Sequence, residues 1–224
     1  MAADNDHSPG HHPHDHAHDS DHGSELSGLQ LRVRALETIL TEKGYVDPAA
    51  LDQIVENVET KIGPHIGARI VARAWVDPVF KQALLARGRE AVRELNIRPG
   101  RLGKLGVAEN TATRHNVVVC TLCSCYPHDL LGDPPWWYRD DSYKERIVGD
   151  PRGTLADRFD LRLPDNVEVR VHDSTSDVRW MVLPCRPEGT EGWSEEQLAR
   201  LVTIDSLVGT AAALAPAALA QGGR

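Results

Sequence analysis

Three cysteines within six residues constrain this chain more than any other feature of its sequence. Cys120, Cys123 and Cys125 form the segment CTLCSC, which directly follows the apolar run HNVVV at residues 115–119. That run predicts a buried strand, and a tight loop at its end would bring the three sulfur atoms to one point. Cysteines so close in sequence cannot staple distant segments together, so the pattern favours metal or redox chemistry.

The spacing of the cysteines leaves several kinds of site open. Thiolates suit zinc, copper(I), iron or cobalt rather than magnesium or calcium, and the peptide nitrogens of Ser124 and Cys125 would lie between the sulfur atoms. The sequence is compatible with structural zinc, an iron–sulfur ligand set, a catalytic metal site or a chance group of buried cysteines. A closed zinc site needs a fourth ligand, for which the candidates are Cys185, His115, His128 and His172.

Composition excludes some classes of function. The 224 residues are 41% hydrophobic and 26% charged, which is ordinary for a folded protein. Lys and Arg number 25 against 33 Asp and Glu, so the formal net charge of -8 offers no basic surface for nucleic acid or an anionic membrane. The sequence contains no apolar run of membrane-spanning length, and its first residues do not resemble a secretory signal. We therefore expect a cytoplasmic protein.

The first 23 residues differ from the rest of the chain. Residues 1–22 contain seven of the eleven histidines and five aspartates, but no Lys or Arg. Such a segment has almost nothing to bury, which predicts a disordered tail that attracts metal ions. The irregular spacing of its histidines favours a native segment over a purification tag.

The segment 24–99 is expected to form an arm of helices. Apolar residues recur at helical spacing, and Asp47-Pro48 is a typical helix start. An arm of this kind is too thin to bury its own apolar stripes, so it should wrap around something else. The predicted helices are 24–43, 49–63, 65–75 and 78–88.

Residues 100–210 are expected to form a mixed α/β domain, which makes the fold class α+β. Short helices are predicted at 142–148 and after Pro151, and Ser194 to Gln197 form a capping box that opens the final helix. Residues 211–224 are rich in Ala, Pro and Gly and predict a loose end. The predicted strands are 115–119, 166–173 and 178–184.

The string HNVVVCTLCSCYP resembles the metal-binding loop of nitrile hydratase α subunits, and the related thiocyanate hydrolase γ subunit has a nearly identical loop. Other segments are similar to the same family, among them GARIVARAWVDPVFKQALLARG, LLGDPPWWYRDDSYKERIV and VLPCRPEGTEGWSEEQLARLVTIDSLVG. The resemblance extends over roughly residues 62–209. It implies the fold of a nitrile hydratase α subunit.

The resemblance also implies a metal centre. One non-corrin Co(III) ion, or alternatively Fe(III), would be held by the sulfurs of Cys120, Cys123 and Cys125 and by the backbone amides of Ser124 and Cys125. In the family the cysteine matching Cys120 stays unmodified, whereas those matching Cys123 and Cys125 become sulfinic and sulfenic acid. Ser124 and Cys125 would then belong to the catalytic centre. Thr121 matches the cobalt form of the loop.

The activity implied is the hydration of a nitrile to its amide in a heteromer. A β-type subunit would supply arginines to the oxidised sulfurs. A metallochaperone or activator protein is a further candidate partner, and the sequence leaves open whether one inserts the metal. Two alternatives within the family are the γ subunit of thiocyanate hydrolase and a nitrile hydratase acting on a nucleoside nitrile, such as toyocamycin nitrile hydratase. A third, from another class, is a metal-storage or delivery protein with a structural zinc loop.

The sequence departs from the family pattern near the loop. His128-Asp129 replaces a usual Trp-Pro, which would widen and polarise the substrate side. Cys185 stands where Gln is usual and is expected to be a small buried residue rather than a fourth ligand. Arg186 matches a family arginine that would brace the oxidised cysteines or a partner chain. Trp137 is expected in the core, and Trp136 in the core or an interface.

Overall fold

The computed structural model describes residues 28–98 and 103–221, and the chain divides into two units after Leu51. The expected tail at residues 1–23 lies outside the described residues. In the first unit, α1 (Gly28–Glu42) has no buried residue, although it contains a long series of apolar side chains. The large exposed apolar side chains of α1 are Leu29, Leu31, Val33, Leu36, Ile39 and Leu40.

Helix α2 (Pro48–Lys61) starts where the sequence predicts. Asp47 accepts a hydrogen bond from the Ala49 N–H at 3.0 Å, and Pro48 occupies the first helical turn, where its missing N–H costs nothing. Ile54 and Val55 on this helix are exposed. The helices of residues 28–61 therefore present apolar side chains to solvent.

Helices α3 (Pro64–Val76), α4 (Pro78–Ala86) and α5 (Gly88–Glu94) behave differently, because they build the core of the second unit. Ile70 and Val71 of α3 are fully buried in one cluster with the strand residues Val117 and Val119. The boundary expected at residue 100 therefore does not divide the core. The helix predicted over 78–88 ends at Ala86, and α5, which was not predicted, follows it.

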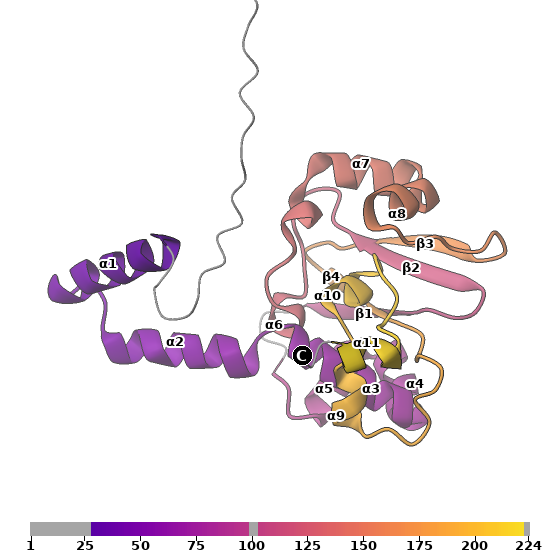
Figure 1. Cartoon of the computed structure of the whole chain (residues 1–224), viewed down its shortest axis with the longest axis horizontal. Coiled ribbons are helices and arrows are strands. Elements are labelled where there is room, and N and C mark those ends of the chain that lie inside the picture. The colour runs from indigo at the N-terminus through magenta and orange to yellow at the C-terminus, as the bar shows by residue number, and fades with distance from the viewer. Residues whose placement is uncertain (1–27, 99–102, 222–224) are drawn as a thin grey trace, which may run out of the picture. The chain divides into compact units, whose positions relative to one another are not determined.

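The strands form two parallel pairs. β1 (Lys104–Glu109) pairs with β4 (Val178–Leu183), and β2 (Arg114–Val119) pairs with β3 (Glu168–Asp173). Helices α7 (Asp141–Gly149) and α8 (Pro151–Phe159) lie on the side of β2 and β3, whereas α3, α4 and α5 lie on the side of β1 (Figure 1). The parallel pairing places the last residue of β2, Val119, beside the last residue of β3, Asp173. The three cysteines begin with the next residue after Val119.

Within residues 28–98 and 103–221, β2, β3 and β4 match the sequence prediction, but β1 was not predicted. Gly106 interrupts the apolar pattern of this strand, and a glycine is required there because a Cβ would lie 2.4 Å from Cε3 of Trp180 on the paired strand. Close approach to an aromatic ring, rather than flexibility, explains this glycine.

The last third of the chain is more helical than predicted. The Ser194 to Gln197 capping box is present at α9 (Glu195–Ala199), but this helix is not the final one. It is followed by α10 (Ile204–Val208) and α11 (Pro216–Gln221), the latter within the segment expected to be a loose end. The remaining short helices are α6 (His128–Leu131) and the 3-10 helix η1 (Trp136–Arg139).

The mixture of helices and strands confirms the expected α+β class. A search of the described residues for a helix that could cross a bilayer finds none of sufficient length and apolarity.

Candidate metal centre

The three cysteines occupy the loop between β2 and α6, and they differ in burial. Cys120 directly follows the last residue of β2 and is fully buried in the hydrophobic core. Cys123 is exposed and Cys125 is half-buried. The loop therefore starts inside the core, reaches the surface at Cys123 and turns inward again at Cys125.

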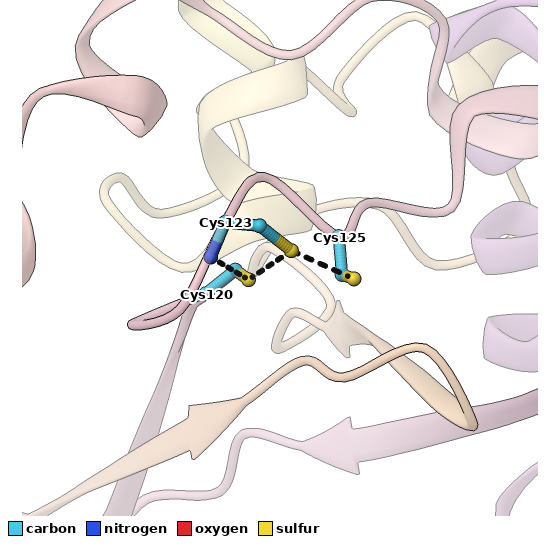
Figure 2. A group of neighbouring side chains, drawn as sticks. All are labelled: Cys120, Cys123 and Cys125. Atoms are coloured by element: carbon cyan, nitrogen blue, oxygen red, sulfur yellow. Dashed lines mark hydrogen bonds between the residues drawn. The ribbon is translucent and has the colours of Figure 1, made fainter.

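The three sulfur atoms form one cluster, as Figure 2 shows. The Cys123 Sγ lies 3.4 Å from the Cys120 Sγ and 3.2 Å from the Cys125 Sγ, and the three atoms lie within 4.8 Å of one another. The Cys123 backbone N–H donates to the Cys120 Sγ at 3.2 Å, which folds the loop back over the inner sulfur. The structure thus brings together the three side chains that the sequence singles out.

The electrostatics of the cluster favour one thiolate in the metal-free chain. The pKa of Cys123 is lowered to about 7, first because its sulfur receives hydrogen bonds from the Cys125 and Cys120 thiols. Backbone N–H groups of Ser124 and Cys125 also lower this pKa, so both amides lie close to the Cys123 sulfur. Burial is the main reason that the pKa of Cys125 is raised to about 12.

This donor set fits a soft or borderline transition metal. Three sulfurs and two nearby peptide nitrogens are stronger donors than the oxygen ligands that magnesium and calcium prefer. Among residues 28–98 and 103–221, no imidazole or carboxylate joins the cluster. A closed zinc site with a fourth side-chain ligand therefore lacks that ligand in the described part of the chain.

The candidate fourth ligands have other positions and partners. His115 Nε2 contacts the Gly209 carbonyl at 2.7 Å, His172 Nε2 contacts Asn116 Oδ1 at 2.8 Å, and His128 Nε2 contacts Asp133 Oδ1 at 3.1 Å.

Cys185 corrects one expectation, since it is exposed rather than buried. It follows β4 and Pro184 and lines two surface hollows, of about 390 and 420 Å3, because the chain leaves the sheet at this point.

The ends of the loop are fixed by polar groups that the sequence analysis did not identify. Asp173 at the end of β3 accepts from the Thr121 N–H at 3.0 Å and from the Thr121 hydroxyl at 2.5 Å. The Tyr138 hydroxyl donates to the Cys125 carbonyl at 3.0 Å, and the Tyr143 hydroxyl donates to the Val118 carbonyl at 2.8 Å. The only signal for Asp173 in the sequence is its place at a predicted strand end, where the partner strand could not be known.

Arg186 forms hydrogen bonds within the fold. Its Nε donates to the Thr190 hydroxyl at 2.9 Å and its Nη1 donates to the Trp75 carbonyl at 3.2 Å. These bonds tie the loop after β4 to the end of α3. Within this chain the guanidinium therefore stabilises the fold, and its expected role at the oxidised cysteines or a partner chain stays a prediction.

The two tryptophans after the loop have opposite environments. Trp137 is buried against Tyr138, Tyr143 and Phe159, which confirms the expected core position. Trp136 is 79% exposed, and the Arg158 guanidinium lies 5.8 Å from its ring centroid. A core position for Trp136 is thus excluded within this chain.

The loop also presents apolar surface. Leu122, at the tip between the first two cysteines, is 91% exposed, and Thr121 and Ser124 are exposed as well. Ligand-binding sites are usually concave and lined by apolar side chains. The sulfur loop of this chain alone is instead open to solvent at Leu122.

Comparison with known proteins places these features in one family. A family model described as "Nitrile hydratase, alpha chain" matches residues 27–211. The low-molecular weight cobalt-containing nitrile hydratase subunit alpha of Rhodococcus rhodochrous is 50% identical over 185 residues, which cover 83% of this chain and 89% of that protein. Thiocyanate hydrolase subunit gamma of Thiobacillus thioparus is 40% identical over 198 residues, covering 84% of this chain and 81% of that protein.

Solved structures give the same result. A double mutant of the Fe-type nitrile hydratase from Comamonas testosteroni Ni1 superposes with a TM-score of 0.70 at 40% sequence identity. The match covers 86% of this chain and 94% of the other.

Proposed function

The chain belongs to the nitrile hydratase α-chain family, and from that membership we propose that it is the metal-bearing subunit of a nitrile hydratase, converting a nitrile to the corresponding amide. The observation that carries the proposal is the convergence of three sulfur atoms within 4.8 Å in the loop that follows β2. The backbone amides of Ser124 and Cys125 beside the Cys123 sulfur complete the donor set.

The ion we propose is Co(III), one per chain, held by the sulfurs of Cys120, Cys123 and Cys125 and the amide nitrogens of Ser124 and Cys125. Support for cobalt comes from Thr121 in the loop and from the cobalt-containing relative. Fe(III) is the alternative, since the solved structure is of an Fe-type enzyme. The bound ion would supply Lewis acidity at one open position.

The different burial of the three cysteines supports a division of roles among them. Cys120 is shielded by the core, which suits an unmodified thiolate, whereas Cys123 and Cys125 are accessible to an oxidant. We assign a sulfinic acid to Cys123 and a sulfenic acid to Cys125. The Cys125 oxygen would then act on the nitrile carbon or take a proton from the attacking water, and the Ser124 amide would hold the loop around it.

A partner subunit accounts for the exposed surfaces. Leu122 at the loop tip and the apolar stripe of α1 are both uncovered in this chain. We propose that a β-type subunit covers them and contributes arginines to the oxidised sulfurs, and that an activator protein inserts the metal. An isolated chain would then have little activity.

Mass spectrometry of the peptide containing Cys120 to Cys125 tests the proposal. The protein would be produced with cobalt and its neighbouring genes and digested without alkylation, with the Cys185 peptide as an internal control for general oxidation. We expect two added oxygens on Cys123, one on Cys125 and none on Cys120 or Cys185. Three unmodified thiols in a metal-loaded sample would overturn the enzyme proposal and favour a structural zinc site in a metal-storage or delivery protein.

Two observations favour a second candidate function, the hydrolysis of thiocyanate. A thiocyanate hydrolase γ subunit is among the relatives, and His128 provides a basic side chain three residues after Cys125. Assays on acrylonitrile, a nucleoside nitrile and thiocyanate separate these substrates. Turnover of thiocyanate alone would replace nitrile hydration, and a His128→Trp variant would then lose thiocyanate turnover while keeping its metal.

A further inference from the structure

A buried network of amide and imidazole groups runs from the start of β2 to β3 and is used by no step described above. It links Asn110 after β1, His115 and Asn116 on β2, and His172 on β3. The Asn116 N–H and Nδ2 both donate to Asn110 Oδ1, at 2.7 and 3.0 Å. Asn110, His115 and Asn116 are all at least nine-tenths buried, so each polar atom needs a partner.

Two backbone groups, the Asn116 N–H and the Gly209 carbonyl, determine which atom donates in each hydrogen bond of the network. Asn110 Oδ1 must accept from the Asn116 backbone N–H, so Asn110 Nδ2 donates to His115 Nδ1 at 3.2 Å. His115 Nε2–H then donates to the Gly209 carbonyl at 2.7 Å, which can only accept. Both ends thus require the same neutral form of His115.

The same logic fixes His172. Asn116 Nδ2 donates to the Glu109 carbonyl at 2.8 Å, so Asn116 Oδ1 is left to accept from His172 Nε2–H at 2.8 Å. The His172 ring also stacks on Trp180, with 4.6 Å between ring centroids. His172 is therefore held by one specific hydrogen bond and one ring contact.

His172 is adjacent in sequence to Asp173, which contacts the sulfur loop. It is paired with Val118 in the β2–β3 register, and the next residue, Asp173, receives both Thr121 donors. We propose that the network is a positioning device for the sulfur loop: it orients His172 and so places the Asp173 carboxylate where it can hold Thr121. Its relevance to catalysis rests on the proposed function, but its effect on the loop does not.

A matched pair of variants at His172 tests the proposal. His172→Gln keeps an N–H that can donate to Asn116, whereas His172→Leu has a similar volume and no donor, and both lose the ring contact with Trp180. In the metal-free full chain, we expect amide hydrogen exchange of peptides covering residues 114–126 to be about fivefold faster in the leucine variant, the factor that corresponds to one neutral hydrogen bond. The glutamine variant should exchange at the wild-type rate.

Equal exchange rates in the two variants would overturn the proposal, because the hydrogen bond from His172 to Asn116 would then have no effect on the loop. Acceleration spread equally over α3 and β1 would overturn it too, since the network would then stabilise the whole fold. Should the His172 variants fail to fold, Asn116→Leu decides the matter, because leucine has no acceptor for His172, with Asn166→Leu as a control at an exposed position. Faster exchange at 114–126 in Asn116→Leu alone supports the proposal, and an unchanged loop refutes it.

The exchange experiment uses no metal and no substrate. Unmodified thiols in the mass spectrum would overturn the nitrile hydratase proposal and leave this result standing. Retention of cobalt by the assembled complex provides the second readout, where the leucine variant should lose metal faster than the glutamine variant.

Discussion

The Asp173 carboxylate receives two hydrogen bonds from Thr121, one at each oxygen. The backbone N–H lies 3.0 Å from Oδ1 and the hydroxyl 2.5 Å from Oδ2. The two residues are 52 positions apart in sequence and meet because Val119 and Asp173 are partners in the parallel β2–β3 pair. This contact fixes the first residue after Cys120 and hence the direction in which the sulfur loop leaves the core.

Asp173→Asn should weaken metal binding by about tenfold, because the amide nitrogen donates where Thr121 needs an acceptor. Competition with a chelator, followed by measurement of cobalt per chain, checks this. Asp165→Asn changes an exposed carboxylate away from the loop and should have no effect. Equal cobalt retention in the two variants would contradict the role given to Asp173.

The three loop cysteines should be required for metal binding, and Cys185 should not. Serine at position 120, 123 or 125 removes one sulfur from the cluster, whereas Cys185→Ser removes a thiol outside it. Elemental analysis of the purified proteins should find cobalt only in the wild type and in Cys185→Ser. Loss of metal from Cys185→Ser would show that the ligand set extends beyond the loop.

Alkylation of the metal-free chain should begin at Cys123. Its pKa of about 7 makes it a thiolate in the neutral range, whereas Cys125, with a pKa raised to about 12, stays protonated there. The rate at Cys123 should therefore rise as the pH passes through about 7 and then level off. Iodoacetamide labelling followed by peptide mass spectrometry measures this order, and labelling of Cys125 before Cys123 would refute it.

Acid should destabilise the fold through His115. Burial lowers the pKa of His115, and the Gly209 carbonyl opposes this only in part. Stability is therefore fully present above the unfolded value of about 6.5 and falls as the pH drops from there through the lower folded value, because the unfolded chain takes up the proton first. The charged or titratable side chains that line the adjoining hollow are Cys185, Arg186 and Glu188.

Denaturant unfolding at neutral pH and at about pH 5.5 measures this loss. A His115→Gln variant, which has no titrating ring, should show a smaller difference between the two conditions. Burial lowers the pKa of His172 as well, so some dependence should remain in the variant. An unchanged difference would exclude His115 as the group responsible.

The apolar stripe of α1 should be needed for assembly but not for folding. Leu36→Asp places a charge in this exposed stripe and should abolish co-purification with the β-type subunit, while the melting temperature of the chain stays the same. Arg34→Asp introduces the same carboxylate on α1 without removing an apolar side chain and serves as the control. Similar co-purification of both variants would contradict a partner on this face.

The sequence predicts those elements whose local signals agree with their environment. The Asp47 and Ser194 caps and the apolar run of β2 specify their own structures, and these predictions are confirmed. β1 was not predicted because Gly106 interrupts its apolar pattern. This glycine leaves room for the ring of Trp180, which is 74 positions away, so no local pattern reveals the reason. The sequence predicts one arm of helices, but the structure places α3 in the core and leaves α1 exposed. Helical spacing is similar in both helices, so only the packing distinguishes them.

The candidate site follows the same rule. The cysteines lie close in sequence, so their convergence could be predicted from spacing and strand placement alone. The groups that fix the loop are distant in sequence, and they depend on the parallel register of β2 and β3. Cys185 was expected to be buried because cysteine usually is, but its position just after a strand end exposes it.

Three side chains that hold the loop and the end of the strand before it are made after the loop. Tyr138, Tyr143 and Asp173 all follow Cys125 in the chain, and β3 cannot pair with β2 until residue 173 has been synthesised. During translation the three thiols therefore leave the ribosome well before the structure that orders them. The geometry that suits a metal arises only late in folding, so a nascent chain offers three unrestrained thiols, and the cell must keep them reduced during that interval.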